Sequence, residues 1–414
     1  MADAEHRKQI LKRGLSVAWE GEPRLGSIIG EEEIAATVQA IRDSMDPNVG
    51  FGMSDGEVDK FENAFAAYVG AKHCVTCNGA GTGIDMAIMA LDLEPGDEVI
   101  TQCINLRAVP MAIAGHGGKI VFAEVDETLQ IDPNDVEKKI TPRTRAIFPT
   151  HMNGMSAPMD DLLELAHRHP HAKHGPLKVI GDAARACGGG SNDAKIGKRG
   201  WMNVFSFHTM KNMTTLGEGG AITTDDSSII GRLHGFRQFG GEGWGSNYKM
   251  SKCQASFGQV QLGRLEAMVG ARRRLAQARH KMLEGCPQLR LPLEPEGHEH
   301  SYYLYSILVS REWAGEKRDR LMTLLRDEYG VDTVVANPPV QDSFPYIRRL
   351  TSGQQLPFSH EIGQRLFCPP IHPAMSDADN EYIAAAIWEA VAQLAGQPRR
   401  DQSRTSPRSA AGKC

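Results

Sequence analysis

No run of roughly 18 or more apolar residues occurs in this chain of 414 residues, although a membrane-spanning helix needs about that length. We therefore expect no membrane partner. The polar first residues, Met1 to Gln9, lack the apolar stretch of a signal peptide, so we expect a cytoplasmic protein. A strong charge of one sign is also lacking, because the net charge is −5 and the sequence pI is ≈ 6.3. This near balance argues against nucleic acid as the main partner.

The eight cysteines form no framework of paired spacings, so we expect reduced thiols rather than disulfides. Cys74 and Cys77 have the spacing of a redox motif, but no second pair accompanies them for zinc. Histidines gather in residues 167–174 and 298–300, in segments flanked by proline or glycine, where we expect solvated loops. We expect no metal site. The run Arg272-Arg-Arg274 is predicted to be a solvated helix face.

A single lysine marks the most informative segment. A β-rich run ends in a polar turn that carries Lys211, and glycine-rich residues 217–220 follow. If Phe205, Phe207 and Met210 wall the amine, desolvation lowers its pKa and frees the lone pair that forms a Schiff base. The alternative is a surface lysine after a buried strand. Partners elsewhere in the chain favour the reactive amine.

Asp182 is the first partner. It follows the short apolar run Lys178-Val-Ile-Gly, which predicts a buried strand. Ligands of parallel α/β sheets bind outside the carboxyl ends of the strands. An aspartate there can keep a pyridine nitrogen protonated, as pyridoxal 5′-phosphate (PLP) requires. The alternative is a helix N-cap, because Ala183 and Ala184 suit the first helical turn.

The second partner is a turn that could hold a phosphate. A predicted strand runs into Asn78-Gly79-Ala80-Gly81-Thr82, and an apolar helical pattern follows. Free N–H groups at such a helix start, with the Thr82 hydroxyl, form a phosphate cup. Its spacing fits neither a Walker loop nor a dinucleotide fingerprint. Phosphate cup, aspartate and lysine therefore follow one another in the order expected of a fold-type I PLP enzyme.

With these motifs the chain resembles the DegT/StrS family of PLP-dependent sugar and aminocyclitol aminotransferases, over about residues 24 to 395. Further landmarks in chain order are Gly30-Glu-Glu-Glu-Ile, Gly96-Asp-Glu-Val-Ile, Gly181-Asp-Ala-Ala, Gly217-Glu-Gly-Gly, Gly245-Ser-Asn-Tyr-Lys and Ile371-His-Pro. Each is common, whereas their joint order is specific.

The resemblance implies a role for each matching residue. Lys211 is the lysine that binds PLP as an imine, and Asp182 is the partner of the ring nitrogen. The phosphate is held by Gly79, Ala80, Gly81, Thr82 and Ser206. Asn247 matches an asparagine that reaches the phosphate from the neighbouring subunit, which implies a homodimer with shared active sites. His151 and His208 are candidates for cofactor or substrate contact, or else ordinary pocket-wall residues, and Lys249 is a further substrate candidate.

Three positions depart from the family pattern. Leu106 stands where an aromatic ring usually covers PLP, so the stacking contribution is lost. Arg185 stands where Gln or His usually lies near the cofactor hydroxyl, and Ala80 replaces a hydroxyl residue in the phosphate turn. Arg107 and Arg185 together suggest an anionic group to bind, such as the carboxylate of the amino donor.

The activity implied is transamination from glutamate or glutamine to a keto-sugar, often nucleotide-linked, or to a keto-cyclitol. Such a reaction serves amino-sugar, cell-surface glycan or antibiotic biosynthesis. Some relatives carry histidine at the lysine position and dehydrate their substrate, whereas this chain keeps Lys211. The alternatives are a dehydratase-like PLP enzyme and a non-catalytic PLP-binding sensor.

Alternating β-like and helical segments predict an α/β fold. The resemblance implies a fold-type I PLP transferase with a large, mostly parallel seven-stranded sheet domain and a smaller C-terminal α/β domain. The strands are expected at 73–76, 98–101, 120–125, 146–150, 178–181, 203–207, 220–224, 302–309 and 332–335. The main helices are expected at 58–69, 84–93, 159–167, 252–283, 318–329 and 377–394.

The predicted organisation has four parts. An N-terminal extension covers residues 1–23, and a large PLP-binding domain covers 24–270. A small domain over 271–395 contains much of the linking helix, and a basic tail at 396–414 is expected to be disordered because it is polar and breaker-rich.

Overall fold

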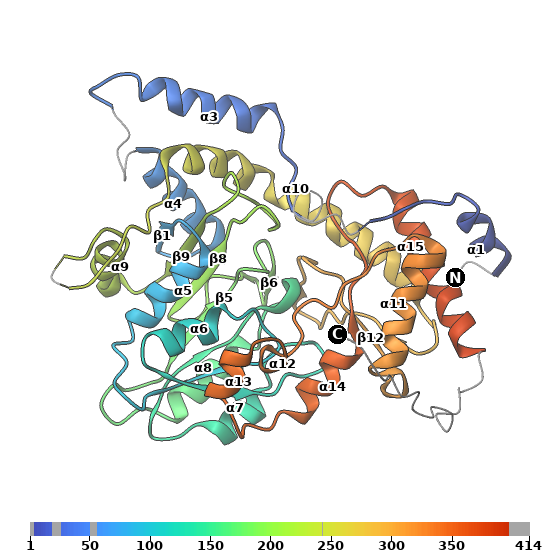
Figure 1. Ribbon diagram of the computed structural model, residues 1–414. Coiled ribbons are helices and arrows are strands. Elements are labelled where there is room, and N and C mark those ends of the chain that lie inside the picture. The colour runs from blue at the N-terminus through green and yellow to red at the C-terminus, as the bar shows by residue number, and fades with distance from the viewer. Residues whose placement is uncertain (1–3, 19–25, 50–55, 242, 397–414) are drawn as a thin grey trace, which may run out of the picture.

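The computed structural model describes residues 4–18, 26–49, 56–241 and 243–396 (Figure 1). The tail expected at 396–414 lies outside these residues apart from Gly396. Within the described ranges, no helix has both the length and the apolar character needed to cross a membrane.

A seven-stranded sheet forms the centre of the larger part. Its strand order is β1-β9-β8-β5-β4-β2-β3, and only β9 runs antiparallel to its neighbours. The strands are β1 His73–Cys77, β2 Glu98–Gln102, β3 Lys119–Ala123, β4 Thr144–Phe148, β5 Lys178–Asp182, β8 Met202–Ser206 and β9 Gly220–Thr224. The predicted mostly parallel sheet is confirmed. Its strands are short apolar runs, almost entirely buried because helices cover both faces.

Helices cover the sheet and build the C-terminal part. The α-helices are α1 Ala4–Leu11, α3 Glu31–Asp43, α4 Gly56–Val69, α5 Ala80–Met89, α6 Ala108–Gly115, α7 Pro133–Lys139, α8 Met159–Arg168, α9 Ile230–Arg237, α10 Lys252–Leu283, α11 Glu316–Tyr329, α12 Val340–Ser343, α13 Pro345–Leu350, α14 Pro357–Arg365 and α15 Asp377–Ala395. Helix α5 packs on β8, β9 and α6, whereas α4 packs on β1 and α10.

The long helix α10 has the predicted bounds and joins the two parts of the molecule, with α3 and α4 at one end and α15 at the other (Figure 1). One apolar core, on the α15 side, combines residues of α10, α11 and α15 with Ile10 and Val17. The core of the large sheet, however, also takes in Val340 and Ile347, from the stretch expected in the small domain. The boundary between the two domains stays a prediction.

Of the two strands expected near the C-terminus, the one at 302–309 is much shorter than predicted and the one at 332–335 is wrong. Only Ile307–Val309 forms a strand (β12), because Tyr302 has a left-handed φ of 46° that interrupts extended structure. Strand β12 pairs with the short β10 Leu289–Arg290 and β13 Leu366–Phe367. The stretch 332–335 forms only an isolated bridge, between Val334 and Cys368. A third small sheet consists of β6 Gly190–Ser191, β7 Ala194–Lys195 and β11 His298–Glu299.

Two predictions of solvent exposure are also wrong. Arg272 is fully buried, because it shares the inward face of α10 with Met268 and Leu275. His300 is buried as well, and its ring stacks on that of Tyr302 with centroids 4.1 Å apart. Burial lowers the pKa of His300 to about 3, which keeps it neutral.

Candidate active site

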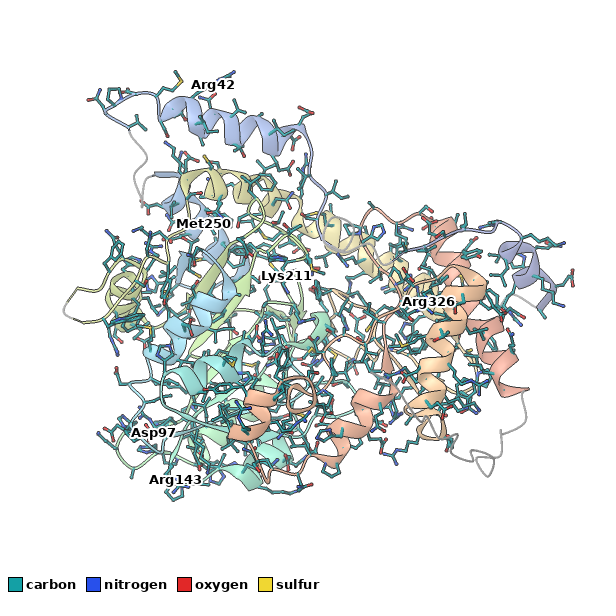
Figure 2. All side chains as sticks on the ribbon, in the orientation of Figure 1. Arg42, Asp97, Arg143, Lys211, Met250 and Arg326 are labelled. Atoms are coloured by element: carbon teal, nitrogen blue, oxygen red, sulfur yellow. The ribbon has the colours of Figure 1, made fainter. Side chains whose placement is uncertain are left out.

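Lys211 lies near the middle of the molecule, between the large sheet and the C-terminal elements (Figure 2). It follows β8 in the turn that returns the chain to β9. The residue is half-buried, and burial of its amine lowers the pKa of Lys211. The expected desolvation is therefore confirmed. The ring beside the amine is that of Tyr303, whose centroid lies 4.9 Å from Nζ, while Phe205 and Phe207 sit in an aromatic cluster with α4.

Asp182 ends β5, at the carboxyl edge of the sheet, and its side chain is buried. Oδ1 accepts a hydrogen bond from the Ala184 N–H at 3.0 Å, and Oδ2 accepts one from Thr150 Oγ1 at 3.5 Å. Burial raises the pKa of Asp182, although these hydrogen bonds and the charges of Lys211 and Arg185 oppose the rise. No helix begins between Asp182 and β6 in this fully described stretch, so the N-cap alternative is wrong.

Arg185 shares the site, as predicted. Its Nη2 donates to Asn337 Oδ1 at 2.8 Å, and its guanidinium lies 5.5 Å from the ring centroid of Tyr303. The positive charge of Arg185 lowers the pKa of Lys211, and the negative charge of the Asp182 carboxylate raises it. Tyr303 and Asn337 were missed in the sequence, because their positions depend on a left-handed φ at Tyr302 and at Asn337 itself.

The phosphate turn lies against the end of the central strands. Ser206 pairs with Gly220 across β8 and β9. A Cβ on Gly220 would stand 2.7 Å from the carbonyl carbon of Gly79 and 2.8 Å from the Ala80 nitrogen. Only glycine therefore lets the start of α5 approach β9 so closely at the residue that pairs with Ser206. The tertiary structure thus brings together residues that are far apart in sequence.

Some polar groups of this turn already form hydrogen bonds within the protein, whereas others have no side-chain partner. Helix α5 begins at Ala80 without a side-chain cap on its first N–H groups. The Thr82 hydroxyl donates within its own turn, at 2.7 Å from the Gly79 carbonyl oxygen and 2.8 Å from Asn78 Oδ1. Space remains at Gly81, where a Cβ would meet nothing within 4 Å. The start of α5 is therefore suited to an anion.

The two histidines differ in environment. His151 is buried, with Nδ1 accepting from the Ala157 N–H at 3.0 Å and Nε2 at 3.4 Å from Asn203 Oδ1. Burial lowers the pKa of His151 to about 4. Since protein groups contact both ring nitrogens, His151 fits the pocket-wall alternative. His208 is half-buried, and its Nε2 lies 3.7 Å from Glu218 Oε1.

Three of the remaining candidates are exposed, and the fourth, Lys249, is half-buried. Leu106 and Arg107 are exposed at the start of α6, and the Arg107 guanidinium stacks 4.8 Å from the Phe344 ring centroid. Lys249 Nζ lies 4.6 Å from the ring centroid of Phe239. Asn247 is exposed in the loop after α9. Among the residues that the structure describes, no hydrogen bond, ion pair or ring contact joins these four to Lys211.

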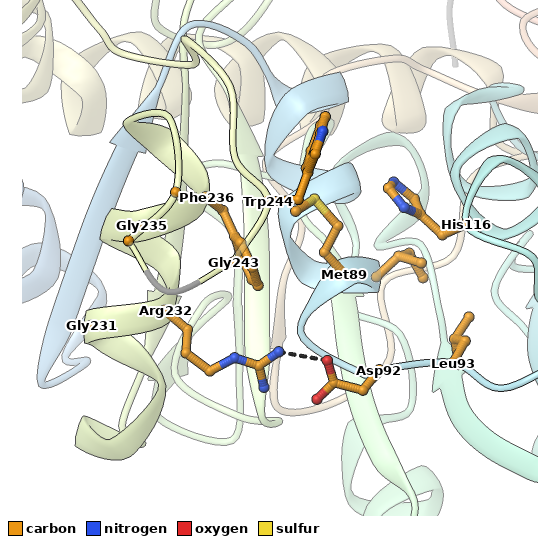
Figure 3. Close-up of a pocket in the computed structure, with 13 residues that line it drawn as sticks. Met89, Asp92, Leu93, His116, Gly231, Arg232, Gly235, Phe236, Gly243 and Trp244 are labelled. Carbon is orange, nitrogen blue, oxygen red and sulfur yellow. Dashed lines mark hydrogen bonds and ion pairs between the residues drawn. The ribbon is translucent and has the colours of Figure 1, made fainter.

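A separate cavity of ≈ 980 Å³ lies between α5, α9 and the glycine-rich loop that follows α9 (Figure 3). Arg232 and Asp92 form an ion pair at 2.7 Å on its wall, and Phe236 and Trp244 supply aromatic surface. Its lining includes neither Lys211 nor Asp182, so the cavity is not the centre built around the lysine.

Comparison with known proteins gives consistent matches along the chain. The sequence profile of the DegT/DnrJ/EryC1/StrS aminotransferase family matches residues 29–388. The spore coat polysaccharide biosynthesis protein SpsC of Bacillus subtilis (strain 168) is 33% identical over 385 residues, which cover 88% of this chain and 95% of SpsC.

Solved structures agree in fold. The structure of S. venezuelae DesV in complex with a ketimine intermediate is 31% identical, with a TM-score of 0.78 over 89% of this chain and 96% of DesV. NtdA of Bacillus subtilis with bound cofactor PMP is 25% identical, with a TM-score of 0.80 over 91% of this chain and 86% of NtdA.

Proposed function

Since the chain belongs to the DegT/DnrJ/EryC1/StrS aminotransferase family, we propose that it moves an amino group from glutamate or glutamine to a keto-sugar or a keto-cyclitol. It is an aminotransferase, and its cofactor is PLP. The observation that carries the proposal is the desolvated amine of Lys211 beside the buried carboxyl group of Asp182.

The residues at the site fit this cofactor. Each oxygen of Asp182 accepts one hydrogen bond and keeps capacity for another, which suits a protonated ring nitrogen. The start of α5 offers N–H groups without a side-chain cap, and it packs against Gly220, the strand partner of Ser206. When bound, PLP supplies an electron sink for the bond changes at the donor carbon.

The chain's own groups have distinct tasks in this proposal. Lys211 acts as a nucleophile through its neutral amine, whose population is increased by burial. The same amine then moves a proton, because it is both basic and close to the reacting centre. Asp182 holds the ring nitrogen protonated. Arg185 binds an anionic group, such as the carboxylate of the amino donor, because the ion pairs of the described residues give it no carboxylate partner.

We extend the proposal to the assembly. Asn247 completes the phosphate site of a neighbouring subunit, so the protein works as a homodimer with shared active sites. The exposure of Asn247 supports the proposed homodimer, because the exposed aromatic residues Phe239 and Trp244 lie in the same loop region. Large exposed apolar side chains near one another are typical of subunit interfaces. We also place the protein in the cytoplasm, with a large and a small domain meeting within α10.

The test is the visible absorption spectrum of the protein with PLP, before and after glutamate and then glutamine. We expect a band from the covalent Lys211 adduct, its loss on addition of one donor, and release of the matching keto acid. Lys211→Ala should lose both the band and turnover, whereas Lys138→Ala removes an exposed lysine of α7 and should keep both. Normal turnover in Lys211→Ala would end the proposal.

The other two candidate functions give different results in the same experiment. A dehydratase-like enzyme would form the band without releasing keto acid from either donor. A PLP-binding sensor would form the band, but no amino donor would convert it. Screening keto-sugars and keto-cyclitols for their aminated products then identifies the acceptor.

A further inference from the structure

The segment from Ser301 to Tyr305 is held in an irregular conformation beside the catalytic lysine. Tyr302 has a φ of 46°, which a bulky side chain adopts only at a cost in free energy. The Ser301 N–H donates to the Gly154 carbonyl oxygen at 2.8 Å. A Cβ on Gly154 would stand 2.9 Å from the Tyr303 nitrogen, so glycine is needed there for the close approach.

A buried arginine fixes the same segment from the other side. Arg272 Nη1 donates to the carbonyl oxygens of Tyr302 at 3.2 Å and Tyr303 at 3.3 Å. It also binds the Ile371 carbonyl oxygen at 2.9 Å, while Nη2 binds that of Gly26 at 3.0 Å. Strained backbone persists where surrounding contacts over-determine it, and it is concentrated at functional sites.

These contacts of Gly154 and Arg272 fix the position of the Tyr303 phenol. Tyr303 is only 5% exposed, and its ring centroid lies 4.9 Å from the amine nitrogen of Lys211 and 5.5 Å from the guanidinium carbon of Arg185. Arg272 adds a third positive charge near it. Tyr303 and Asp182 both raise the pKa of the Lys211 amine and so oppose the effect of Arg185. A phenol among three cations is suited to exist as phenolate.

From this geometry we infer that Tyr303 is a positioning residue that holds the Lys211 amine and exchanges a proton with it. The proton leaves Nζ for the phenolate oxygen, which leaves a neutral amine and a neutral phenol, and it returns by the reverse step. The inference rests on the proposed transaminase function, in which the free amine must alternate between its two protonation states.

The directions of the pKa shifts agree with such an exchange. Burial lowers the pKa of Lys211. Burial by itself raises the pKa of Tyr303, but the charges of Lys211, Arg185 and Arg272 outweigh it and leave that pKa below its ordinary value. Amine and phenol therefore both titrate below their usual ranges.

The experiment compares Tyr303→Phe with Tyr305→Phe. Tyr305 is a second buried phenol, which bonds His280 Nδ1 at 3.0 Å in the other core. The first measurement needs no cofactor. We expect wild type and Tyr305→Phe to show one tyrosine whose near-ultraviolet tyrosinate signal appears below the usual tyrosine range, and Tyr303→Phe to lack it.

The second measurement follows modification of Lys211 by cyanate across pH, by peptide mass spectrometry. Without the phenolate charge, the midpoint for Lys211 should move to lower pH in Tyr303→Phe and stay unchanged in Tyr305→Phe. With PLP and donor, Tyr303→Phe should still form the covalent band but convert it at least about tenfold more slowly, a modest loss for a proton-transfer group.

The two proposals fail in different ways. Absence of the covalent band or of any donor reaction in the wild-type protein would count against the transaminase function. A wild-type protein that transaminates but has no early-titrating tyrosine would overturn the role of Tyr303, whether or not the variants fold. Equal Lys211 midpoints and equal band conversion in Tyr303→Phe and Tyr305→Phe would overturn it as well.

Discussion

Replacing Arg272 with methionine tests how the C-terminal segment is attached to the active site. The guanidinium donates to four carbonyl oxygens, those of Gly26, Tyr302, Tyr303 and Ile371. Methionine keeps an apolar stem of similar length but cannot donate. Each buried carbonyl left without its donor costs about 1–3 kcal/mol, so four of them cost at least roughly 4 kcal/mol.

An opposing contribution reduces this loss. Burial lowers the pKa of Arg272 to about 10, which shows that the charged form is desolvated at a cost. Methionine removes that cost, so the net loss is smaller than the cost of the four carbonyl groups left without a donor. We therefore expect Arg272→Met to lower the free energy of unfolding by roughly 3 kcal/mol.

The neighbouring Arg274 provides a matched control. It lies on the exposed side of α10 and pairs with Asp377 at the surface, where ion pairs contribute about 0–1 kcal/mol. Urea unfolding of both methionine variants, without PLP and at one protein concentration, measures the difference, because ligand and subunit association also shift the midpoint. Equal urea midpoints for Arg272→Met and Arg274→Met would refute the reasoning.

Two further predictions concern the cup and the buried histidine. Gly220→Ala should weaken PLP binding at least about tenfold, or about 1.4 kcal/mol, because its Cβ would collide with Gly79 and Ala80. A PLP titration checks this, with Gly263→Ala as the control since no atom lies within 4 Å of its Cβ; unchanged affinity in Gly220→Ala would contradict it. His151 has a pKa of about 4 in the folded protein, below the value of about 6.5 in the unfolded chain. Between these two pH values the unfolded chain binds a proton that the folded protein does not. Stability is therefore lost as the pH falls through that window, by up to about 3 kcal/mol. Urea midpoints across that window should fall less steeply in His151→Asn, and equal slopes would exclude His151 as the cause.

Much of the large sheet could be predicted, because its strands are short apolar runs between turn residues. The seven predicted strands correspond to those observed with shifts of a few residues at their ends. Helix α10 has the predicted bounds because residues 252–283 contain no proline and Ser251 caps the first turn. The places of Lys211 and Asp182 in the fold could be predicted for a similar reason, since Lys211 follows such a strand and Asp182 ends one.

The burial of Arg272 and the conformation of residues 302–305 were predicted wrongly, because each segment was interpreted from the types of residue it contains. Three consecutive arginines suggested a solvated face, yet Arg272 lies three and four residues from Leu275 and Met268 on the buried stripe of α10. Helical spacing was the signal that could have found it. The aromatic run at 302–305 suggested a strand, and no local signal indicates that Tyr302 has a left-handed φ.

The sequence by itself determined much of the strand and helix order, and it placed Lys211, Asp182 and residues 79–82 at or after the ends of predicted strands, because these features depend on residues adjacent in the chain. Only the tertiary structure decided that the Tyr303 ring lies beside Lys211, and that Arg185 contacts both Tyr303 and Asn337. It also decided that Gly220 joins the phosphate turn to Ser206. Those contacts depend on how distant segments pack, and the free energy of packing offsets a strained backbone that local preferences alone would not select.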